Sequence, residues 1–245
     1  MKAPNVGKWS KHQHIAKDAR LQAYLPPTKR FSPAALWEYM ENYGDVILKP
    51  SGGGGGAGII KMSSLDGERY RIHAGSIRRV VEGKEAVLHA LKSLFRPKIY
   101  LLQPHLSLGR INGRPFDVRV MVQRTRSNQR WQVTGWLAKL AGPGYVVTNV
   151  ARSRGSVLSL QNAIQRSGIP KRPDLLFDIK KVSLAVASCL GKAYPRLLEI
   201  GLDLGLDQEG KIWVIEANFR PALSLFQRLP EKTFYRRIKA FRIRT

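Results

Sequence analysis

The sequence predicts an α+β fold with mostly antiparallel sheets. Short runs of alternating polar and apolar residues are joined by tight glycine-rich turns, as in β-hairpins. Helical patterns stand between groups of strands and do not follow each strand in turn, which argues against repeated βαβ units. The 245 residues are 43% hydrophobic, enough to bury a core.

The elements follow in order along the chain. Residues 1–30 are polar and basic, and the prolines of "YLPPT" favour an extended segment, so a lead-in is predicted. The segment "SPAALWEYMENYG" has the pattern of a helix, with Ser32 as N-cap, Pro33 at its first position and Gly44 at its end. The predicted helices are 32–44, 84–95 and 173–195. The predicted strands are 45–50, 58–63, 69–74, 77–81, 99–105, 116–124, 131–141, 145–151, 198–207 and 211–218.

The charge is the most unusual bulk property. The chain has 42 Lys and Arg against 17 Asp and Glu, a formal net charge of +25. This charge predicts a polyanionic partner, such as nucleic acid, acidic polymer, anionic lipid or nucleotide phosphate, without choosing among them. The basic C-terminal tail, residues 236–245, fits either a solvated helix or a nucleic-acid-binding arm.

Cysteine content and hydropathy indicate in which cellular compartment the chain is expected. The single cysteine, Cys189, excludes a disulfide within the chain and favours a reducing, cytoplasmic environment. Its apolar neighbours favour a buried thiol over a nucleophile. The N-terminus has no apolar signal-peptide core, and no window approaches the ~18 apolar residues of a spanning helix, so neither secretion nor a membrane span is expected.

Five consecutive glycines lie between two predicted strands. Gly53, Gly55 and Gly58 match G-x-G-x-x-G, but a dinucleotide fingerprint needs a helix after the loop, and an alternating pattern follows here. A Walker A loop also needs Gly-Lys-Ser/Thr, which is missing. The functional interpretation is a flexible β-hairpin lid whose N–H groups close over phosphates, with Lys49 reaching a phosphate from the entering strand. A disordered turn is the alternative.

A carboxylate pair is predicted on the strands "LEIGLDLGLD" and "KIWVIEAN". If the chain turns at Glu209–Gly210, with Gln208 facing Lys211, Asp203 lies opposite Glu216. Asn218 then lies on the same sheet face. Adjacent carboxylates repel each other, and a divalent cation reverses that effect; oxygen ligands of this kind suit Mg²⁺ or Mn²⁺. An exposed hairpin with neutralising basic neighbours is the alternative.

The strand "RPFDVRVMVQR" places Asp117 and Arg119 on one face. An exposed ion pair between them is one interpretation. The other is that Arg119 acts as a fixed fork for a γ-phosphate.

Taken together, these motifs resemble the ATP-grasp superfamily over most of the chain. The resemblance implies two α+β subdomains, expected at residues 31–102 and 103–235, with ATP between them. It also implies formation of an acyl-phosphate from a carboxylate, attacked by an amine, thiol or similar nucleophile. The implied metal ligands are Asp203, Glu216 and Asn218. The implied nucleotide ligands are Lys49, the lid glycines Gly53, Gly54, Gly55, Gly56 and Gly58, and the adenine-binding hinge Leu102, Gln103, Pro104 and His105.

Within the superfamily, four segments are similar to the YheC/YheD branch, which is associated with the spore coat. They are "WSKHQHIAKDARLQAYLPPT", "VILKPSGGGGGAGIIKM", "LLQPHLSLGRINGRPFDVRVMVQR" and "VTNVARSRG". The last resembles a segment close to the transferring phosphate in related ligases. The resemblance therefore implies phosphate or substrate roles for Asn149, Arg152, Arg154 and Lys139.

Three departures from the superfamily pattern affect these expectations. Arg110 stands where many relatives carry an acidic ribose ligand. Gly201 stands where D-alanine:D-alanine ligases carry an arginine, which leaves Arg119 to compensate. The chain starts close to the ATP-binding part, so an N-terminal pre-ATP-grasp domain is expected to be absent and the substrates cannot be inferred.

Three functions remain open at this stage. The leading one is a Mg²⁺-dependent ATP-grasp ligase in which Lys49, Arg119 and Asn149 act on the transferring group. The second is a non-catalytic, spore-coat-associated protein that keeps the fold and holds acidic polymers or coat proteins on its basic surface. The third, nucleic-acid binding, has no stacking platform or recognition helix in its favour.

Overall fold

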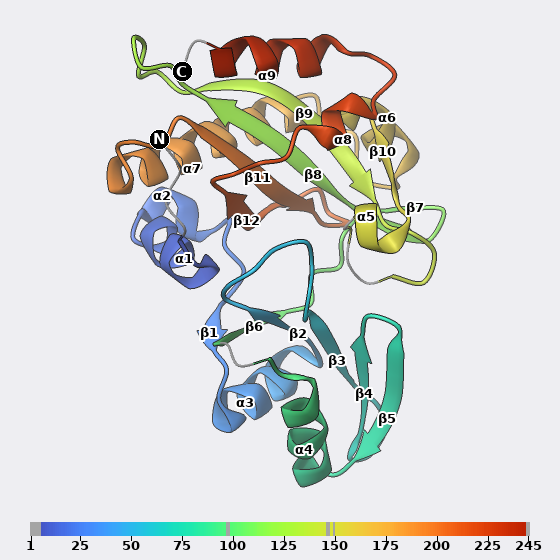
Figure 1. Cartoon of the computed structure of the whole chain (residues 1–245). Coiled ribbons are helices and arrows are strands. Elements are labelled where there is room, and N and C mark those ends of the chain that lie inside the picture. Colours follow the sequence, from blue (N-terminus) through green and yellow to red (C-terminus); the bar gives the residue numbers. More distant parts are fainter. Residues whose placement is uncertain (1–5, 97–98, 146–147, 149, 244–245) are drawn as a thin grey trace. The chain divides into compact units, whose positions relative to one another are not determined.

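The computed structural model describes residues 6–96, 99–145, 148 and 150–243 (Figure 1). The chain forms two compact units. The smaller unit comprises residues 26–106, and the larger unit comprises residues 107–245 together with the N-terminal residues 1–25. Each unit contains helices and an antiparallel sheet, so the predicted α+β class is confirmed.

The smaller unit is built on one antiparallel sheet with the strand order β1-β6-β2-β3-β4-β5. Its helices are α3 (Pro33–Tyr43) and α4 (Lys84–Leu94). As predicted, Ser32 caps α3 by accepting from the Ala35 N–H, and Gly44 ends it with φ of 67°. The strands are β1 (Lys29–Arg30), β2 (Asp45–Pro50), β3 (Ile60–Ser64), β4 (Arg69–Ala74), β5 (Ile77–Glu82) and β6 (Tyr100–Pro104).

Alternation along the strands places the apolar core of the smaller unit on one face of this sheet. Val46, Leu48 and Ile72 belong to a single core cluster with Leu36 of α3 and Leu91 of α4. Lys49 follows Leu48 along β2, so its side chain lies on the other face of the strand. The helices therefore cover one face of the sheet, and Lys49 belongs to the opposite face.

The larger unit contains a sheet with the strand order β10-β9-β8-β11-β12, and β7 pairs with β8. Its strands are β7 (Arg110–Ile111), β8 (Arg114–Gln123), β9 (Gln132–Leu140), β10 (Ser156–Leu158), β11 (Glu199–Leu206) and β12 (Ile212–Asn218). Its helices are α1 (Lys8–Ala16), α2 (Ala19–Gln22), α5 (Val150–Ser153), α6 (Leu160–Arg166), α7 (Leu175–Ala193), α8 (Ser224–Gln227) and α9 (Thr233–Ile243).

Both faces of this sheet are used. Even-numbered residues of β8 and β11, such as Val120 and Leu202, join α6 and α7 in the main core. On the opposite face Met121 and Leu137 form a second cluster with Phe226 of α8 and Ile238 of α9. Figure 1 shows α9 lying along this side of the sheet. Helices α8 and α9 cover only part of that face, and the charged residues described below occupy another part of it.

The N-terminal segment is more structured than the lead-in expected from the sequence. It forms α1 and α2, which were not predicted, and Ile15 and Leu21 are almost fully buried in the core of the larger unit. The backbone carbonyl of Tyr24 accepts from the N–H of Val214. The described part of this segment, residues 6–25, therefore packs with a sheet that is formed more than 80 residues later in the chain.

The strand predicted over residues 145–151 is wrong where the structure describes it. Tyr145 and Thr148 lie outside any strand, and Val150–Ser153 form the short helix α5. The backbone there packs so tightly on the end of β9 that a Cβ at Gly142 would lie 1.5 Å from the Ser153 carbonyl oxygen. Tertiary packing of α5 thus outweighs the β-propensity of Val150.

Among the described residues, no helix is long and apolar enough to cross a membrane.

Candidate functional site

The predicted pairing of Asp203 with Glu216 is confirmed. Strands β11 and β12 form an antiparallel hairpin in which Asp203 lies opposite Glu216, and Gly201 lies opposite Asn218. Arg119 of β8 is the partner of Asp203 on its other side. Arg119, Asp203 and Glu216 therefore form one row across three neighbouring strands.

The hairpin reaches this register by a route that the sequence did not reveal. At the turn, Asp207 and not Gln208 pairs with Lys211, and Gly210 has φ of 79°. The register shifts between Asp203 and Leu204, where Ile215 is the extra residue of a β-bulge. Without the bulge, Ile215 would lie opposite Asp203 and Glu216 would point into the core.

Asp203 is the most heavily contacted carboxylate of the site. Its two oxygens accept from Nε of Arg119 at 2.8 Å and from Nη2 at 3.0 Å. The Lys139 ammonium lies 2.8 Å from Oδ1, and the Asn218 amide donates to Oδ2 at 3.2 Å. Asp203, Arg119 and Lys139 are all buried. The structure therefore brings together four of the residues predicted for the site.

Asp117 lies on the same face as Arg119, but its ion pair is with Lys139. Its carboxylate lies 3.1 Å from the Lys139 ammonium and accepts a short hydrogen bond from the hydroxyl of Thr148. Asp117 is only 4% exposed, so the alternative of an exposed ion pair is wrong. Lys139 bridges Asp117 and Asp203, because all three side chains extend from the same face of adjacent strands.

These contacts separate the acidities of the two aspartates. Burial raises the pKa of Asp117 to about 6. The negative charge of Asp203 raises it as well, and the positive charge of Lys139 lowers it. Burial would also raise the pKa of Asp203, but Arg119 and Lys139 outweigh burial and hold this pKa at about 2. The carboxylates in turn raise the pKa values of Arg119 and Lys139, despite their burial. Asp117 is therefore the member of the cluster that titrates closest to neutral pH.

Sequence reasoning missed two lysines of α1. The Lys8 ammonium lies 3.5 Å from a Glu216 carboxylate oxygen. Lys11 is buried, donates to the Ala217 carbonyl at 2.5 Å and lies over the ring of Phe219. Burial lowers the pKa of Lys11, partly offset by the charge of Glu216. The basic pattern "KWSK" was visible, but only the tertiary structure places α1 beside β12.

Gly201 has a structural reason for having no side chain. A Cβ there would lie 2.6 Å from Cβ of Pro221 and 2.9 Å from Nη1 of Arg119. The guanidinium of Arg119 and the ring of Pro221 thus fill the space over Gly201. An arginine at this position, as in the D-alanine ligases that the sequence resembles, would collide with Arg119.

The glycine-rich loop and Lys49 lie in the smaller unit. Strands β2 and β3 pair as an antiparallel hairpin around the loop, as predicted. Residues 53–55 at the loop tip are exposed. Positive φ angles at Gly53, Gly55, Gly56 and Gly58 favour glycine at those positions. Lys49 is buried at the end of β2, next to the loop.

The predicted adenine hinge coincides with β6 and the residue that follows it. Leu102 pairs with both β1 and β2, and Gln103 donates to the Thr28 hydroxyl at 2.7 Å. The His105 N–H donates to the carbonyl of Asp45. Pro104 ends the strand, and the chain passes from the smaller to the larger unit after Leu106.

The other candidate residues, Asn149, Arg152, Arg154 and Arg110, are not among the contacts of Asp203 that the structure describes. Asn149 lies outside the described residues, and only the backbone of Arg152 is described, in α5. Arg154 is exposed and has φ of 51°, in the left-handed region. Arg110 is exposed and donates to the carbonyl of Gly113 at 2.7 Å. The structure therefore does not bring Arg110 or Arg154 into the contacts around Asp203.

The donor set fits a hard divalent cation. Asp203, Glu216 and Asn218 present carboxylate and amide groups from one face of one hairpin, and oxygen donors suit Mg²⁺. The described residues contain no group of three or more His, Cys, Asp or Glu side chains placed to hold a metal. A cation bound here would thus need further oxygen ligands, and Mg²⁺ typically takes them from water and substrate phosphates.

Comparison with solved structures shows that the chain has the fold of ATP-grasp ligases. The ATP-grasp ligase PsnB, in complex with the precursor peptide PsnA2 and AMPPNP, has a TM-score of 0.55 and 17% identity, covering 98% of this chain and 59% of that chain. The ADP complex of purK, an N5-carboxyaminoimidazole ribonucleotide synthetase, has a TM-score of 0.56 and 15% identity, covering 97% and 51%. At these identities the likeness shows the fold.

The family follows from the sequence comparison. Residues 2–243 match the YheC/D-like ATP-grasp family, and the chain belongs to it. Two relatives come from Bacillus subtilis (strain 168). The endospore coat-associated protein YheD is 28% identical over 225 residues, which are 89% of this chain and 49% of YheD. The endospore coat-associated protein YheC is 25% identical over 222 residues, which are 87% of this chain and 59% of YheC. The chain thus spans about half the length of these relatives.

Proposed function

We propose that this protein binds ATP with Mg²⁺ and uses it to activate a carboxylate for attack by an amine or similar nucleophile. The observation that carries the proposal is the row of Arg119, Asp203 and Glu216, joined by Lys139 and Asn218, in a chain of the ATP-grasp family. Basic side chains and oxygen donors lie side by side on one sheet face. The basic side chains can bind phosphate oxygens and the oxygen donors can bind Mg²⁺, so the face suits a complex of Mg²⁺ with a polyphosphate.

Asp203, Glu216 and Asn218 would hold the cation, whose positive charge would offset that of the phosphates. Arg119 and Lys139 neutralise Asp203 in the absence of a ligand. Their raised pKa values keep both protonated, so both side chains could instead stabilise the charge of phosphate oxygens in the ligand-bound protein. Exchange of partners avoids leaving any buried charge uncompensated.

The proposed reaction has two steps. A carboxylate oxygen of the substrate attacks the γ-phosphorus, the bond to the bridging oxygen breaks, and ADP leaves. The nucleophile then attacks the carbonyl carbon of the acyl-phosphate, loses a proton and releases inorganic phosphate. Arg119 and Lys139 would orient the transferring group and stabilise its charge in the first step. Asn149 is a further candidate for this role, on the family resemblance alone.

The smaller unit would supply the other nucleotide contacts. Family resemblance assigns phosphate contacts to Lys49 and the lid glycines, and adenine contacts to residues 102–105. The hairpin around the glycine loop supports the assignment, because an exposed glycine tip presents backbone N–H groups without side-chain obstruction. Arg152 is a phosphate candidate on resemblance alone.

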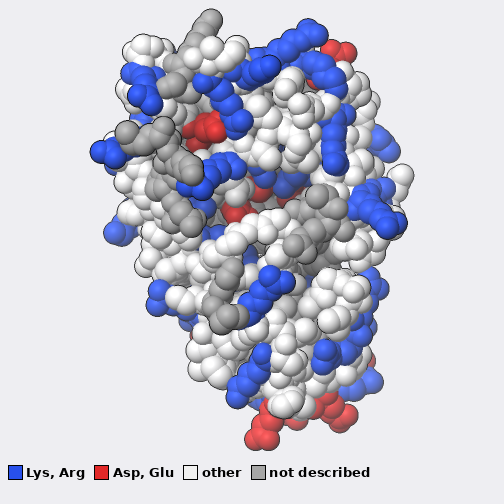
Figure 2. All heavy atoms as spheres, viewed as in Figure 1, with Lys and Arg blue, Asp and Glu red and all other residues white. Residues whose placement is uncertain are grey.

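One observation favours a second candidate, a non-catalytic protein that retains the fold. An unused carboxylate pair would be costly if it were uncompensated, but here Asp203 is paired with Arg119 and Lys139, and Glu216 lies beside Lys8. The cluster can therefore persist without a metal. Figure 2 shows Lys and Arg spread widely over the visible face, and such a surface suits acidic polymers or acidic coat proteins as partners.

The first test is calorimetric titration of ATP, with Mg²⁺ and with a chelator, into wild type and Glu216→Ala. Glu216 is suitable because its side chain is 22% exposed and its closest described ion pair is 3.5 Å long, so the fold should tolerate the change. We expect the variant to lose at least about tenfold in Mg²⁺-dependent affinity, because one of the proposed ligands is gone.

Glu209→Ala is the matched control, since Glu209 is an exposed carboxylate in the turn of the same hairpin. It should bind as wild type does. Equal, metal-independent binding by all three proteins would contradict the metal assignment. If wild type binds Mg²⁺ and ATP but forms ADP only at background rate across a panel of carboxylates and amines, the non-catalytic candidate is favoured.

A further inference from the structure

We infer that Arg242 in α9 is a positioning residue for the candidate site: it holds the segment after Asn218 and thereby the guanidinium of Arg119. The consequence for ligand binding rests on the function proposed above, whereas the anchoring itself does not. Nothing in the family resemblance assigns a role to α9.

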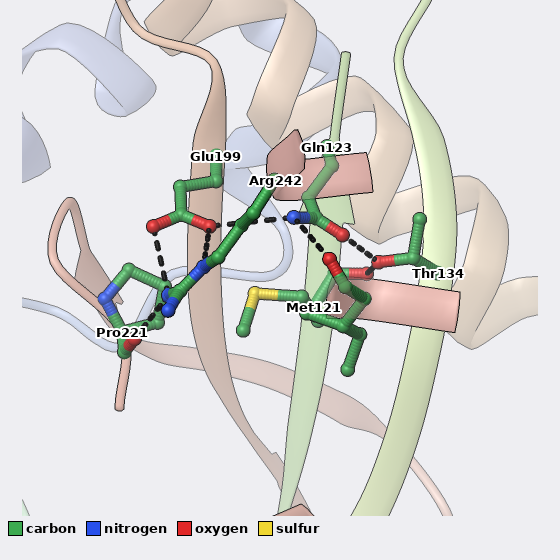
Figure 3. Close-up of polar contacts among 7 residues, drawn as sticks. Met121, Gln123, Thr134, Glu199, Pro221 and Arg242 are labelled. Atoms are coloured by element: carbon green, nitrogen blue, oxygen red, sulfur yellow. Dashed lines mark hydrogen bonds and ion pairs between the residues drawn. The ribbon is translucent and has the colours of Figure 1, made fainter. Parts of the chain in front are cut away.

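Arg242 is bound by two groups at once (Figure 3). Its Nε and Nη2 donate to the two carboxylate oxygens of Glu199 at 2.8 and 2.9 Å. Nη2 also donates to the carbonyl of Pro221 at 2.7 Å. The planar fork of arginine can satisfy both acceptors in one fixed geometry, and lysine cannot.

Glu199 is itself held by the sheet. It lies opposite Gln123 of β8, whose amide donates to a Glu199 oxygen at 3.3 Å and to the Ile238 carbonyl of α9 at 3.4 Å. The Thr134 hydroxyl donates to Gln123 at 2.6 Å. Arg242 therefore links Pro221 to Glu199 of β11 and, through Gln123 and Thr134, to β8 and β9 (Figure 3).

Pro221 reaches the site through Gly201. Gly201 is the register partner of Asn218, and a Cβ at Gly201 would contact both Pro221 and Nη1 of Arg119. The Pro221 ring and the Arg119 guanidinium thus lie over the same glycine. Two residues separate Pro221 from Asn218 in sequence, so a shift of Pro221 acts on Asn218 through the chain and on Arg119 through packing.

The same sheet face carries the site and the docking surface of α9. Asp117 and Arg119 precede Met121 and Gln123 along β8 at alternate positions. Met121 packs against Ile238 in the second core cluster, and Gly135 allows α9 to lie close to β9. The β8 residues that contact α9 therefore lie next to Arg119 on the same face of the strand.

The experiment compares Arg242→Met and Arg242→Lys with wild type. Arg237→Met is the matched control, because Arg237 is an exposed arginine of the same helix. Hydrogen exchange of the ligand-free proteins reports the mobility of residues 217–223. Calorimetry with and without Mg²⁺ then reports ATP affinity. Glu199→Gln, which weakens the same anchor from its other side, is used if Arg242→Met does not fold.

We expect faster exchange at residues 217–223 in Arg242→Met, a smaller increase in Arg242→Lys and no change in the control. Mg²⁺-dependent ATP affinity should fall roughly 2- to 30-fold in Arg242→Met, whereas affinity measured with a chelator should change less. A loss of equal size with and without Mg²⁺ would indicate general destabilisation and overturn the positioning role.

Unchanged exchange at residues 217–223 in Arg242→Met would overturn the inference whatever the nucleotide result. If wild type itself binds no ATP with Mg²⁺, the proposed function fails, and with it the effect on binding. Faster exchange in that case would still establish the anchoring by Arg242, so the two failures can be told apart.

Discussion

At the scale of single residues, the site is a balance of buried charges. Asp203 has three cationic or amide partners and remains ionised, whereas Asp117 shares Lys139 with it and is only partly compensated. The pattern of separated acidities is typical of functional sites, although buried ion networks produce it as well. The two aspartates should therefore affect stability in opposite directions as the pH changes.

Asp117→Asn tests this balance. The folded-state pKa of Asp117 is raised to about 6, so its contribution to stability is complete below about pH 4 and is lost as the pH rises through 6. Asp203 has a lowered pKa of about 2, and its contribution is lost only as the pH falls from about 4 toward 2. The wild type should lose about 2 kcal/mol of stability between pH 4.5 and 8 through this group, whereas the variant should not. The Tm of the variant minus that of wild type should therefore rise by about 4–8 °C over this pH range.

Thermal unfolding at several pH values checks this expectation. Asp174→Asn is the control, because Asp174 is exposed at the start of α7. The prediction is contradicted if the Tm of Asp117→Asn runs parallel to that of wild type over this pH range.

At the scale of elements, two hairpins contain the residues of the proposed function, and they differ in how firmly they are held. The β11–β12 hairpin is fixed by its core residues and by a bulge, which sets Glu216 opposite Asp203. The β2–β3 hairpin ends in glycines with positive φ and an exposed tip. One hairpin is suited to holding ligands rigidly, and the other to closing over phosphates.

The glycine hairpin should respond to nucleotide. Hydrogen exchange at residues 51–58 should slow at least about tenfold when saturating ATP and Mg²⁺ are added, because N–H groups that bind phosphate are protected from water. The turn between β4 and β5, at Gly75, serves as an internal control and should be unaffected. Identical exchange of the loop with and without nucleotide would argue for a plain turn.

At the scale of the whole molecule, the two ends of the larger unit come from distant parts of the sequence. Residues 1–25 pack with residues 107–245, while residues 26–106 form the smaller unit. The contribution of α1 and α2 includes Ile15, Leu21 and the buried Lys11 beside β12. The N-terminal segment is thus a structural part of the unit that carries Asp203 and Glu216.

Removal of residues 1–25 should therefore destabilise the larger unit. The loss of two large buried side chains alone is expected to cost roughly 4 kcal/mol or more, because each such deletion costs about 2–5 kcal/mol. Urea unfolding followed by circular dichroism measures the change, and Ile15→Ala provides a milder variant with a proportionate loss. A truncated chain as stable as wild type would contradict the packing of α1 and α2.

Local patterns were enough to predict much of the fold. The caps of α3, the α4 and α7 helices and most strands depend on residues close in sequence. The pairing of Asp203 with Glu216 was also predicted, but the turn differs from the predicted one by one residue and the bulge compensates for the difference. The same patterns, together with the family resemblance, led to the ATP-grasp family, which the match over residues 2–243 confirms. Periodicity and turn chemistry act over a few residues, so they can be seen in the sequence alone.

Other features depend on contacts between distant segments, and only the folded chain reveals them. Arg119 pairs with Asp203, 84 residues away, and not with its near neighbour Asp117. The lysines of α1 lie beside β12, the bulge at Ile215 sets Glu216 opposite Asp203, and Ser153 of α5 packs closely on Gly142. Local propensity is a small energy per residue, and a buried charge or a close backbone contact outweighs it. The partners of the site's charged residues are therefore a property of the tertiary structure.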